Sequence, residues 1–167
     1  MIKDKLYLTE FKLKDFITLN IMKFNTLKEE ILFNKKLDKF YPDIYLPKDN
    51  LIIEFDGYSH FNSIKTQKLD IAKNEYCKLN SLRIIRIPYF IQLSKESIRH
   101  YFNIDIEYAQ SYSHGFIDNK ALRPDDFNLI GLNLFKNILG SVPSGIKLEI
   151  LKSIENLDIR TKGFLNI

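Results

Sequence analysis

The feature that most constrains the fold of this chain is an apolar run at residues 51–56 (sequence LIIEFD), which ends in acidic side chains and is followed by Gly57. Residues 40–46 before it are aromatic and rich in strand-forming types, and the intervening residues 47–50 have the composition of a turn. Two strand-like segments joined by a short turn predict a β-hairpin with a four-residue loop.

The register of that hairpin brings acidic residues together. If residues 47–50 form the loop, Leu46 pairs with Leu51, and Asp43 lies opposite Glu54. Because side chains alternate along a strand, Glu54 and Asp56 share a face, which Asp43 also shares. Opposed like charges destabilise a sheet, so three converging carboxylates predict a compensating cation, and a hard divalent ion fits best. The alternative is that each acid is a solvated residue at a strand edge.

The residues after the acidic strand extend the candidate site. Gly57 is expected to adopt a positive φ and turn the chain sharply, which places His60 near the acids as a metal ligand, a general base or a phosphate contact. Asp70 and Lys73 are three residues apart on the next predicted helix and share a face. They form either an ordinary helix ion pair or a functional pair, in which Lys73 stabilises charge at a phosphate while Asp70 orients it or supports the metal.

Periodicity predicts two helices in the first half of the chain. Apolar residues at helical spacing indicate helices over residues 10–23 and 64–80, the second with an apolar face. That face is expected to consist of Leu69, Ala72, Tyr76 and Leu79. Residues 26–29 have the form of a capping box, and residues 30–33 after them fit either a helix or a short strand.

The remaining elements complete a mixed fold. Residues 83–87 predict a strand ahead of a proline, and Ser94 is expected to cap a helix that runs to about Tyr101. Residues 126–139 and 144–157 predict two short amphipathic helices. This order predicts an α/β (α+β) sandwich. The segments HGF at 114–116 and RPD at 123–125 are interpreted as structural turns.

Charge favours a polyanionic partner. The chain of 167 residues carries a net charge of +4 and has a pI of about 9.0. Residues 1–103 hold 18 basic and 13 acidic side chains, whereas residues 104–167 hold 7 and 8. A basic N-terminal part suits nucleic acid, although a solvated lysine-rich surface would give the same count.

Composition also narrows the compartment and the chemistry. The single cysteine, Cys77, excludes an internal disulfide framework and a multi-cysteine zinc site. No stretch approaches the roughly 18 apolar residues of a membrane span, and no signal peptide is recognised. We therefore expect no membrane partner and an intracellular location. The abundance of Ile, Lys and Asn, whose codons are A+T-rich, favours a microbial host or a virus- or phage-infected cell.

Four segments together resemble the PD-(D/E)XK nuclease superfamily, and within it the branch related to very-short-patch-repair endonucleases and some phage homing endonucleases. They are YPD at 41–43, LIIEFDGYSH at 51–60, DIAK at 70–73 and RIIRIP at 83–88. The resemblance covers roughly a third of the chain. It implies a restriction-endonuclease-like core, with a small mixed β-sheet flanked by helices, over residues 1–103. Residues 104–167 match nothing in the family and are expected to form a helical C-terminal extension that packs on the core.

The resemblance implies a role for each matching residue. Asp43 corresponds to the family's metal-binding aspartate and Glu54 to its second acid, while Asp56 stands where the family usually has a lysine. Either Asp56 is a further metal ligand, or the basic role has moved to Lys73 or His60. These five residues are the expected catalytic residues, and the three acids among them are the expected metal ligands.

Supporting residues complete the expected site. The family places a glutamate on its first helix, for which Glu10 is the candidate, and Asp70 is assigned a supporting role. Lys65, Lys68 and Arg86 are expected to bind nucleic acid.

The activity implied by the resemblance is hydrolysis of DNA phosphodiester bonds by a homing, restriction or repair-type endonuclease. One or two Mg²⁺ or Mn²⁺ ions would neutralise charge and activate water, and Lys73 or His60 would stabilise the transition state or assist proton transfer. DNA is the expected partner and RNA the alternative. A homodimer is compatible with one site per subunit.

Three other functions stay open at this stage. The first is an RNase or a structure-specific resolvase with the same chemistry. The second is a catalytically silent nucleic-acid-binding domain on the same scaffold, which the aspartate at the usual lysine position favours. The third, a small-molecule metalloenzyme, is disfavoured because the sequence has no Gly-rich phosphate loop or cofactor fingerprint.

Overall fold

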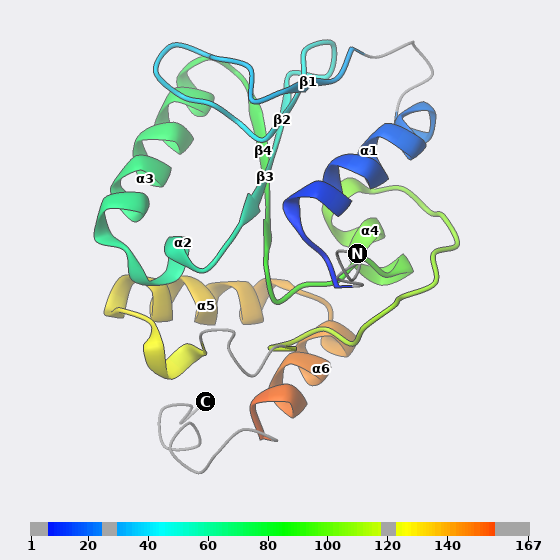
Figure 1. Ribbon diagram of the computed structural model, residues 1–167, viewed down its shortest axis with the longest axis vertical. Helices are drawn as coiled ribbons and strands as arrows, with labels where there is room; N and C mark the ends of the chain where they lie inside the picture. The colour runs from blue at the N-terminus through cyan, green and yellow to red at the C-terminus, as the bar shows by residue number, and fades with distance from the viewer. Residues whose placement is uncertain (1–6, 25–29, 118–122, 156–167) are drawn as a thin grey trace, which may run out of the picture.

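The computed structural model describes residues 7–24, 30–117 and 123–155 as a mixed α+β structure (Figure 1). Its elements, in chain order, are α1 (Glu10–Phe24), β1 (Leu32–Phe33), β2 (Ile44–Leu46), β3 (Leu51–Asp56), α2 (Ser59–Asn62), α3 (Ile64–Leu79), β4 (Arg83–Pro88), α4 (Lys95–Phe102), a 3₁₀ turn η1 (Pro124–Asp126), α5 (Leu129–Ser141) and α6 (Ser144–Glu155).

A four-stranded mixed sheet with the order β1-β2-β3-β4 forms the centre. The predicted hairpin register is confirmed, because Leu46 pairs with Leu51 and Ile44 with Ile53. Strands β1, β2 and β3 are antiparallel, whereas β3 and β4 are parallel. Parallel neighbours need a crossover connection, which α2 and α3 provide.

Helices cover both faces of the sheet. Helix α3 lies against one face, while α1 and α4 lie on the opposite side, and α5 crosses below the end of β3 with α6 beyond it (Figure 1). One hydrophobic cluster joins the layers, from Leu13 in α1 through Phe61 and Phe90 to Ile150 in α6. Residues of α5 and α6 therefore share a core with the sheet.

Most of the predicted elements are confirmed by the structure. The helices over residues 10–23 and 64–80 appear as α1 and α3, and the strand over 83–87 as β4. Ser94 caps α4 by accepting a hydrogen bond from the backbone N–H of Ser97. The open choice for residues 30–33 is resolved by strand β1, whereas the capping box at 26–29 lies outside the described residues.

The helix expected over residues 126–139 begins later than predicted. Residues 124–126 form the 3₁₀ turn η1 instead, and α5 starts at Leu129. Asn128 caps it, because its side chain accepts a hydrogen bond from the backbone N–H of Gly131 at 2.8 Å.

The predicted apolar face of α3 is wrong. Leu69 is 53% exposed and Leu79 is 85% exposed. The helix instead turns polar residues toward the sheet, at a spacing of three or four that follows one helical face. They are Asp70 and Asn74, which contact Arg86, and Lys73, which contacts Glu54, whereas the buried residues of the helix are Gln67 and Cys77.

Charged side chains on the sheet explain why α3 turns polar residues toward it. The strands β3 and β4 present Glu54, Asp56 and Arg86 to α3, and Glu54 and Asp56 are each only 3% exposed. Burying charged groups is costly unless they are paired and hydrogen-bonded. A polar helix face supplies those partners, and an aliphatic face would not.

The turn after β3 also differs from expectation. Gly57 does not adopt a positive φ. Its N–H donates to the carbonyl of Phe55 at 3.1 Å, and Tyr58 already has helical backbone angles (φ −54°, ψ −37°), so helical backbone makes the turn. A positive φ does occur at Gly115 (φ 127°), where a Cβ would lie 2.2 Å from the Ser153 hydroxyl oxygen. Residues 114–116 are thus a tight turn packed against α6.

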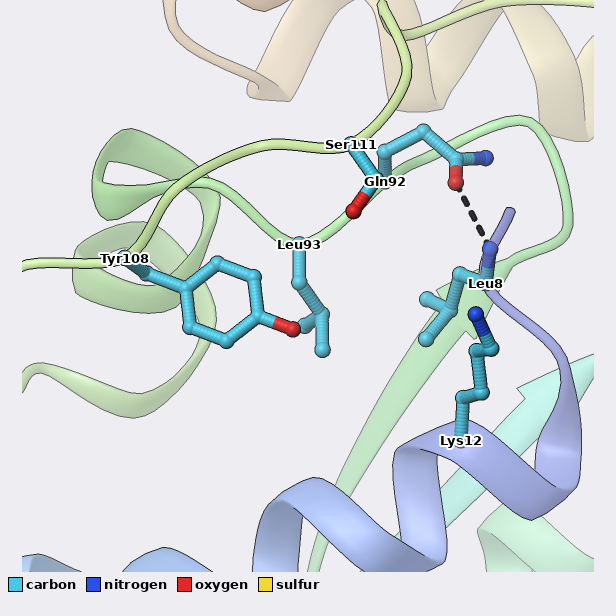
Figure 2. A pocket seen from close by; sticks show the side chains of 6 residues that line it. All are labelled: Leu8, Lys12, Gln92, Leu93, Tyr108 and Ser111. Carbon is cyan, nitrogen blue, oxygen red and sulfur yellow. Dashed lines mark hydrogen bonds between the residues drawn. The ribbon is translucent and has the colours of Figure 1, made fainter. Parts of the chain in front are cut away.

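A buried polar network ties distant segments together. The Gln92 side-chain oxygen accepts from the backbone N–H of Leu8 at 2.7 Å (Figure 2), and the Gln92 backbone N–H donates to His114 Nδ1 at 2.9 Å. His114 Nε2 lies 3.2 Å from the Ser94 hydroxyl, and the His114 backbone N–H donates to the Glu149 carboxylate at 2.7 Å. Because Nδ1 accepts a hydrogen bond, the neutral Nε2–H tautomer fits this network.

Over the described ranges, the structure contains no helix that is both long enough and apolar enough to cross a membrane.

Candidate functional site

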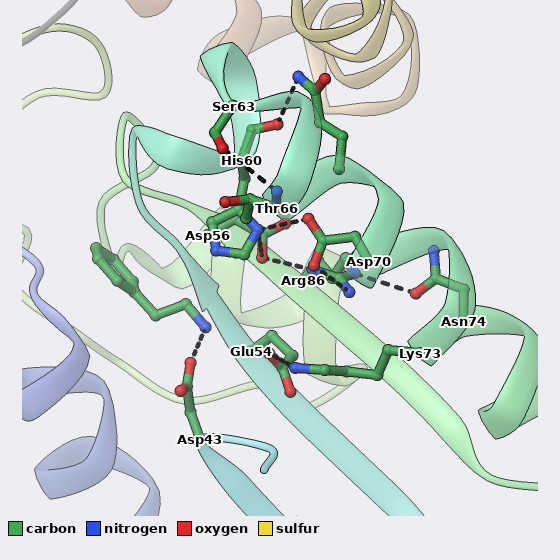
Figure 3. Close-up of polar contacts among 12 residues, drawn as sticks. Asp43, Glu54, Asp56, His60, Ser63, Thr66, Asp70, Lys73, Asn74 and Arg86 are labelled. Atoms are coloured by element: carbon green, nitrogen blue, oxygen red, sulfur yellow. Dashed lines mark hydrogen bonds and ion pairs between the residues drawn. The ribbon is translucent and has the colours of Figure 1, made fainter. Parts of the chain in front are cut away.

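The Asp43 carboxylate lies at the point where β2 begins. Strand β2 starts one residue later, at Ile44, so Asp43 leaves the ladder instead of pairing directly with Glu54. Its Oδ2 accepts the backbone N–H of Phe55 at 2.8 Å (Figure 3). The side chain thereby takes over a hydrogen bond that a strand backbone would otherwise make, and is fixed beside β3.

The site consists of two groups of side chains. Glu54 and Lys73, together with Asp43, form the first group. Lys73 Nζ in α3 lies 2.6 Å from Glu54 Oε2, and the two side chains are 13% and 4% exposed. The second carboxylate oxygen, Glu54 Oε1, is buried and has no hydrogen-bond partner among the described residues. A buried carboxylate oxygen without a partner is costly, so Glu54 retains an acceptor for a cation or a donor.

Asp56 belongs to a second group, held together by Arg86. The Arg86 guanidinium donates through Nη1 to Asp56 at 2.7 Å, lies with Nη2 3.0 Å from Asp70, and donates through Nε to Asn74 at 3.2 Å (Figure 3). Arg86 is paired in register with Glu54 on the parallel strand β4. The arginine therefore compensates the charge of the buried Asp56.

His60 and Asp70 form a close dyad in this second group. His60 Nδ1 lies 2.6 Å from Asp70 Oδ2 and 3.5 Å from Asp56 Oδ1. With an ionised Asp70, Nδ1 carries the proton, and Nε2 of the neutral ring keeps its lone pair. A carboxylate that orients a histidine in this way creates a proton acceptor at Nε2.

Burial shifts the pKa values of the acids upward. Burial raises the pKa of Asp43 despite the hydrogen bond from Phe55, and raises the pKa of Glu54 despite Lys73. Repulsion from Asp43 also raises the pKa of Glu54. Burial likewise raises the pKa of Asp56, although Arg86 opposes it. All three sites therefore favour a proton or a cation more than exposed acids do.

The pKa shifts of the His60–Asp70 dyad favour the charged form of each group. Burial alone would raise the pKa of Asp70, but the hydrogen bond from His60 and the charge of Arg86 outweigh it and lower the pKa. Burial would lower the pKa of His60, but Asp70 and Asp56 outweigh it and raise the pKa above the ordinary 6.5. Asp70 thus stays ionised while His60 titrates above its usual range.

The structure divides the three predicted metal ligands between the two groups. Asp43 and Glu54 lie in the group of Lys73, and Asp56 lies in the group of Arg86. Within the described part of the chain, no group of three or more His, Cys, Asp or Glu side chains is arranged to hold a metal ion. The metal site of three carboxylates expected from ideal hairpin geometry stays a prediction.

The supporting residues occupy different environments. Glu10 is 47% exposed, pairs with Lys14 at 2.5 Å and raises the pKa of Asp43 by its charge, so it lies on the same side as the first group. Lys65 and Lys68 are exposed on α3. Arg86, predicted to contact nucleic acid, has its guanidinium turned to side chains of the protein, and that contact stays a prediction.

The sequence analysis did not identify Asn74 or the residues that hold α2 in place. Asn74 lies one helical turn after Asp70, a spacing that indicates a shared face, yet an asparagine there carries no charge signal. Gln67 donates to the carbonyl of His60 at 3.2 Å and exchanges two hydrogen bonds of 3.0 Å with Asn128 before α5. This long-range pairing fixes α2, and a local sequence pattern does not contain it.

Comparison of the chain with protein-family models, with curated proteins and with solved structures finds no match.

Proposed function

We propose that this protein is a Mg²⁺-dependent endonuclease that hydrolyses DNA phosphodiester bonds. The observation that carries the proposal is Glu54, which is buried beside Asp43, bound to Lys73 through one oxygen and left without a hydrogen bond on the other. An arrangement of buried acids and a lysine, next to a histidine–aspartate dyad, is typical of a site that handles a charged phosphate and a proton.

The finer fold assignment is part of the same proposal. A restriction-endonuclease-like core is supported by where the matching residues lie. Asp43 is at the start of β2, Glu54 and Asp56 are on β3, and the Asp70/Lys73 pair is on α3. Glu10 lies in the first turn of α1, where the resemblance places a glutamate.

The donor set around Glu54 fits a hard divalent cation. Asp43 uses one oxygen for the Phe55 N–H, and Glu54 uses one for Lys73, so each retains a second carboxylate oxygen. Oxygen ligands are those that Mg²⁺ prefers, and Asp43 and Glu54 would hold it. When bound, the ion would neutralise phosphate charge and lower the pKa of a water molecule.

His60 supplies the base in this account. Its Nε2 takes a proton from the attacking water while the water oxygen forms a bond to phosphorus and the phosphorus–oxygen bond to the leaving group breaks. Asp70 holds the ring through Nδ1 and stabilises the imidazolium that results. Lys73, next to Glu54, stabilises the negative charge that develops on the phosphoryl oxygens.

Exposed lysines on α3 and on the loop that packs against it support a nucleic-acid partner. Lys65 and Lys68 extend from α3 into solvent. The loop between β1 and β2 packs on α3 through Phe40 and Tyr76, whose ring centroids are 5.4 Å apart. It adds the exposed lysines Lys35, Lys36 and Lys39. Lysines that neutralise phosphates give an affinity that falls steeply with salt.

One observation favours a second candidate, a nucleic-acid-binding domain without catalysis. Lys73 and Arg86 already pair with Glu54 and Asp56, so the buried acids have cationic partners in the absence of a metal. A domain of this kind would bind DNA with the same salt dependence but leave it intact.

A panel of labelled substrates tests the proposal and separates the alternatives. Duplex DNA, single-stranded DNA, RNA and a four-way DNA junction are incubated with protein and Mg²⁺, and binding is followed in parallel in EDTA. We expect metal-dependent cutting of duplex DNA. Cutting confined to RNA or to junctions would replace the proposed substrate, and binding without cutting of any member would favour the silent domain.

A further inference from the structure

A cavity of about 160 Å³ opens beside the His60–Asp70 dyad. Its polar side is formed by residues of the second group, including Asp56, His60 and Asn74 (Figure 3). Its other side is aliphatic and comes from two helices that meet there: Ile71 of α3, and Ile130 and Leu134 of α5. Most of the cavity surface is apolar.

The size of the cavity limits what it can hold. A water molecule occupies about 30 Å³ in the liquid, so the cavity has room for about five waters. Pockets for drug-sized ligands begin at about 300 Å³. One planar ring system fits such a space, whereas a whole nucleotide does not.

The charged groups around the cavity pair with one another. Arg86 lies 2.7 Å from Asp56 and 3.0 Å from Asp70 and donates through Nε to Asn74, although its Nη2 makes no hydrogen bond within the described residues. Two carboxylates and a mostly apolar wall disfavour a phosphate, so the cavity suits an uncharged group.

The apolar wall is exposed without contributing fully to the core. Ile71 is 54% exposed and Ile130 is 49% exposed, although both lie on helices that bury other faces. The Asn74 amide nitrogen, also in the lining, has no hydrogen bond to the described residues, so it is available to a polar group of a ligand. An uncharged group with apolar faces and a polar edge matches this lining.

We infer that the cavity accepts a single nucleobase, unstacked from a DNA strand whose phosphate lies at the proposed active site. The inference rests on the proposed function, and it assigns a base-binding subsite to the same site. Enzymes that extrude a base hold it between apolar side chains and hydrogen-bond its edge. The aliphatic wall packs against the ring, and the Asn74 amide contacts the edge.

Methyl NMR tests this subsite without cleavage. The full chain, labelled at Ile δ1 and Leu methyl groups, is titrated in EDTA with each of the four 2′-deoxynucleoside 5′-monophosphates. We expect saturable ring-current shifts at the methyls of Ile71 and Ile130. Ile64, 57% exposed on α3 but outside the cavity lining, is the internal control and should not shift. Absent shifts at Ile71 and Ile130, or equal shifts at Ile64, would overturn the inference.

Matched variants on α5 sharpen the result. Ile130→Ala removes part of the wall and should weaken nucleotide binding about fivefold to tenfold. Leu129→Ala, at a neighbouring residue that is 75% exposed and outside the lining, should leave the affinity unchanged. Equal effects of the two variants would overturn the inference.

Two further titrations identify the chemical group that the cavity binds. Inorganic phosphate alone should not shift the cavity methyls, and shifts equal to those with nucleotides would overturn the assignment to a base. Binding restricted to ribonucleoside monophosphates would overturn the assignment to DNA.

The substrate panel keeps the two proposals separable. Cleavage of DNA without methyl shifts would leave the nuclease standing and remove the base subsite. Methyl shifts without cleavage would support the base subsite and count against the nuclease.

Discussion

The ammonium of Lys73 lies 2.6 Å from a carboxylate oxygen of Glu54, and the two side chains join α3 to β3 across the charged face of the sheet. Because Glu54 is 4% exposed at its side chain, it depends on this partner for its charge. Removing one member of a buried pair leaves an uncompensated charge, which destabilises more than the pair itself stabilises.

Lys73→Met is therefore expected to lower the free energy of unfolding by about 3 kcal/mol. Adding Glu54→Gln to that variant should recover part of the loss, because a neutral amide no longer needs a cation. Urea denaturation of both single variants and the double variant gives the coupling energy. Lys78→Met, at an exposed position on the same helix, should change stability by no more than about 0.5 kcal/mol. Strict additivity of the two site variants would contradict the pairing.

The pH dependence of cleavage follows from the dyad. His60 must be neutral to accept a proton at Nε2, and Asp70 and Asp56 raise its pKa above 6.5. The rate should therefore rise with pH through a midpoint above 6.5. Asp70→Asn removes the carboxylate that orients the ring, so it should lower the rate and shift that midpoint downward. A pH profile with no titration above 6.5 would contradict the role of His60 as the base.

His114 is expected to make the free energy of unfolding depend on pH below 6.5. Burial lowers its pKa, although the nearby Glu149 carboxylate opposes the shift. A depressed pKa means that the unfolded state binds the proton first, so the stabilising contribution is present above pH 6.5 and is lost as the pH falls below it. Protonation would also remove the Nδ1 acceptor of the Gln92 N–H.

Urea denaturation at several pH values between about 7 and 5 checks this prediction. The wild type should lose stability on acidification, and His114→Gln should lose less of it over the same interval. His60 contributes with the opposite sign, because its raised pKa stabilises the fold below 6.5 and loses that effect as the pH rises through the folded value. An unchanged slope in His114→Gln would contradict the assignment.

Two glycines of α5 should respond in opposite directions to the same substitution. At Gly131 a Cβ would lie 1.7 Å from the carbonyl oxygen of Phe61, so Gly131→Ala must push α5 away from α2. We expect a loss of about 1–3 kcal/mol in the free energy of unfolding, the usual range for overpacked cores. At Gly140 a Cβ meets no atom within 4 Å, so Gly140→Ala should stabilise the helix by about 0.5–1 kcal/mol. Thermal denaturation distinguishes them, and equal effects would contradict the close approach of the helices.

Local patterns were enough to predict the hairpin. The apolar run at 51–56 and the turn at 47–50 fix the pairing of Leu46 with Leu51, because a loop of known length leaves one register. The same reasoning fails at the next expected pair, Asp43 with Glu54. Asp43 leaves the ladder because its side chain hydrogen-bonds to Phe55, and ladder geometry extended from the sequence does not include that competition.

The face of α3 shows why periodicity alone misassigns a buried surface. Leu69 and Leu79 follow helical spacing and were predicted to be buried, but the sheet opposite carries charge. Arg86 sets this environment, because it compensates Asp56 and Asp70 from a neighbouring strand. A contact between residues so far apart in sequence depends on the tertiary arrangement, which local propensity does not encode.

Cleavage of a supercoiled plasmid tests the central claim most directly. Wild-type protein, Asp43→Asn and Glu75→Gln are compared in Mg²⁺, Mn²⁺ and EDTA, with circular dichroism as the control for folding. Glu75 is exposed on α3 and outside the site, so Glu75→Gln matches the change of charge without touching the acids. We predict nicked or linear product that requires the metal, persists in Glu75→Gln and is lost in folded Asp43→Asn. Cutting by Asp43→Asn at the wild-type rate, or cutting that continues in EDTA, would contradict the account.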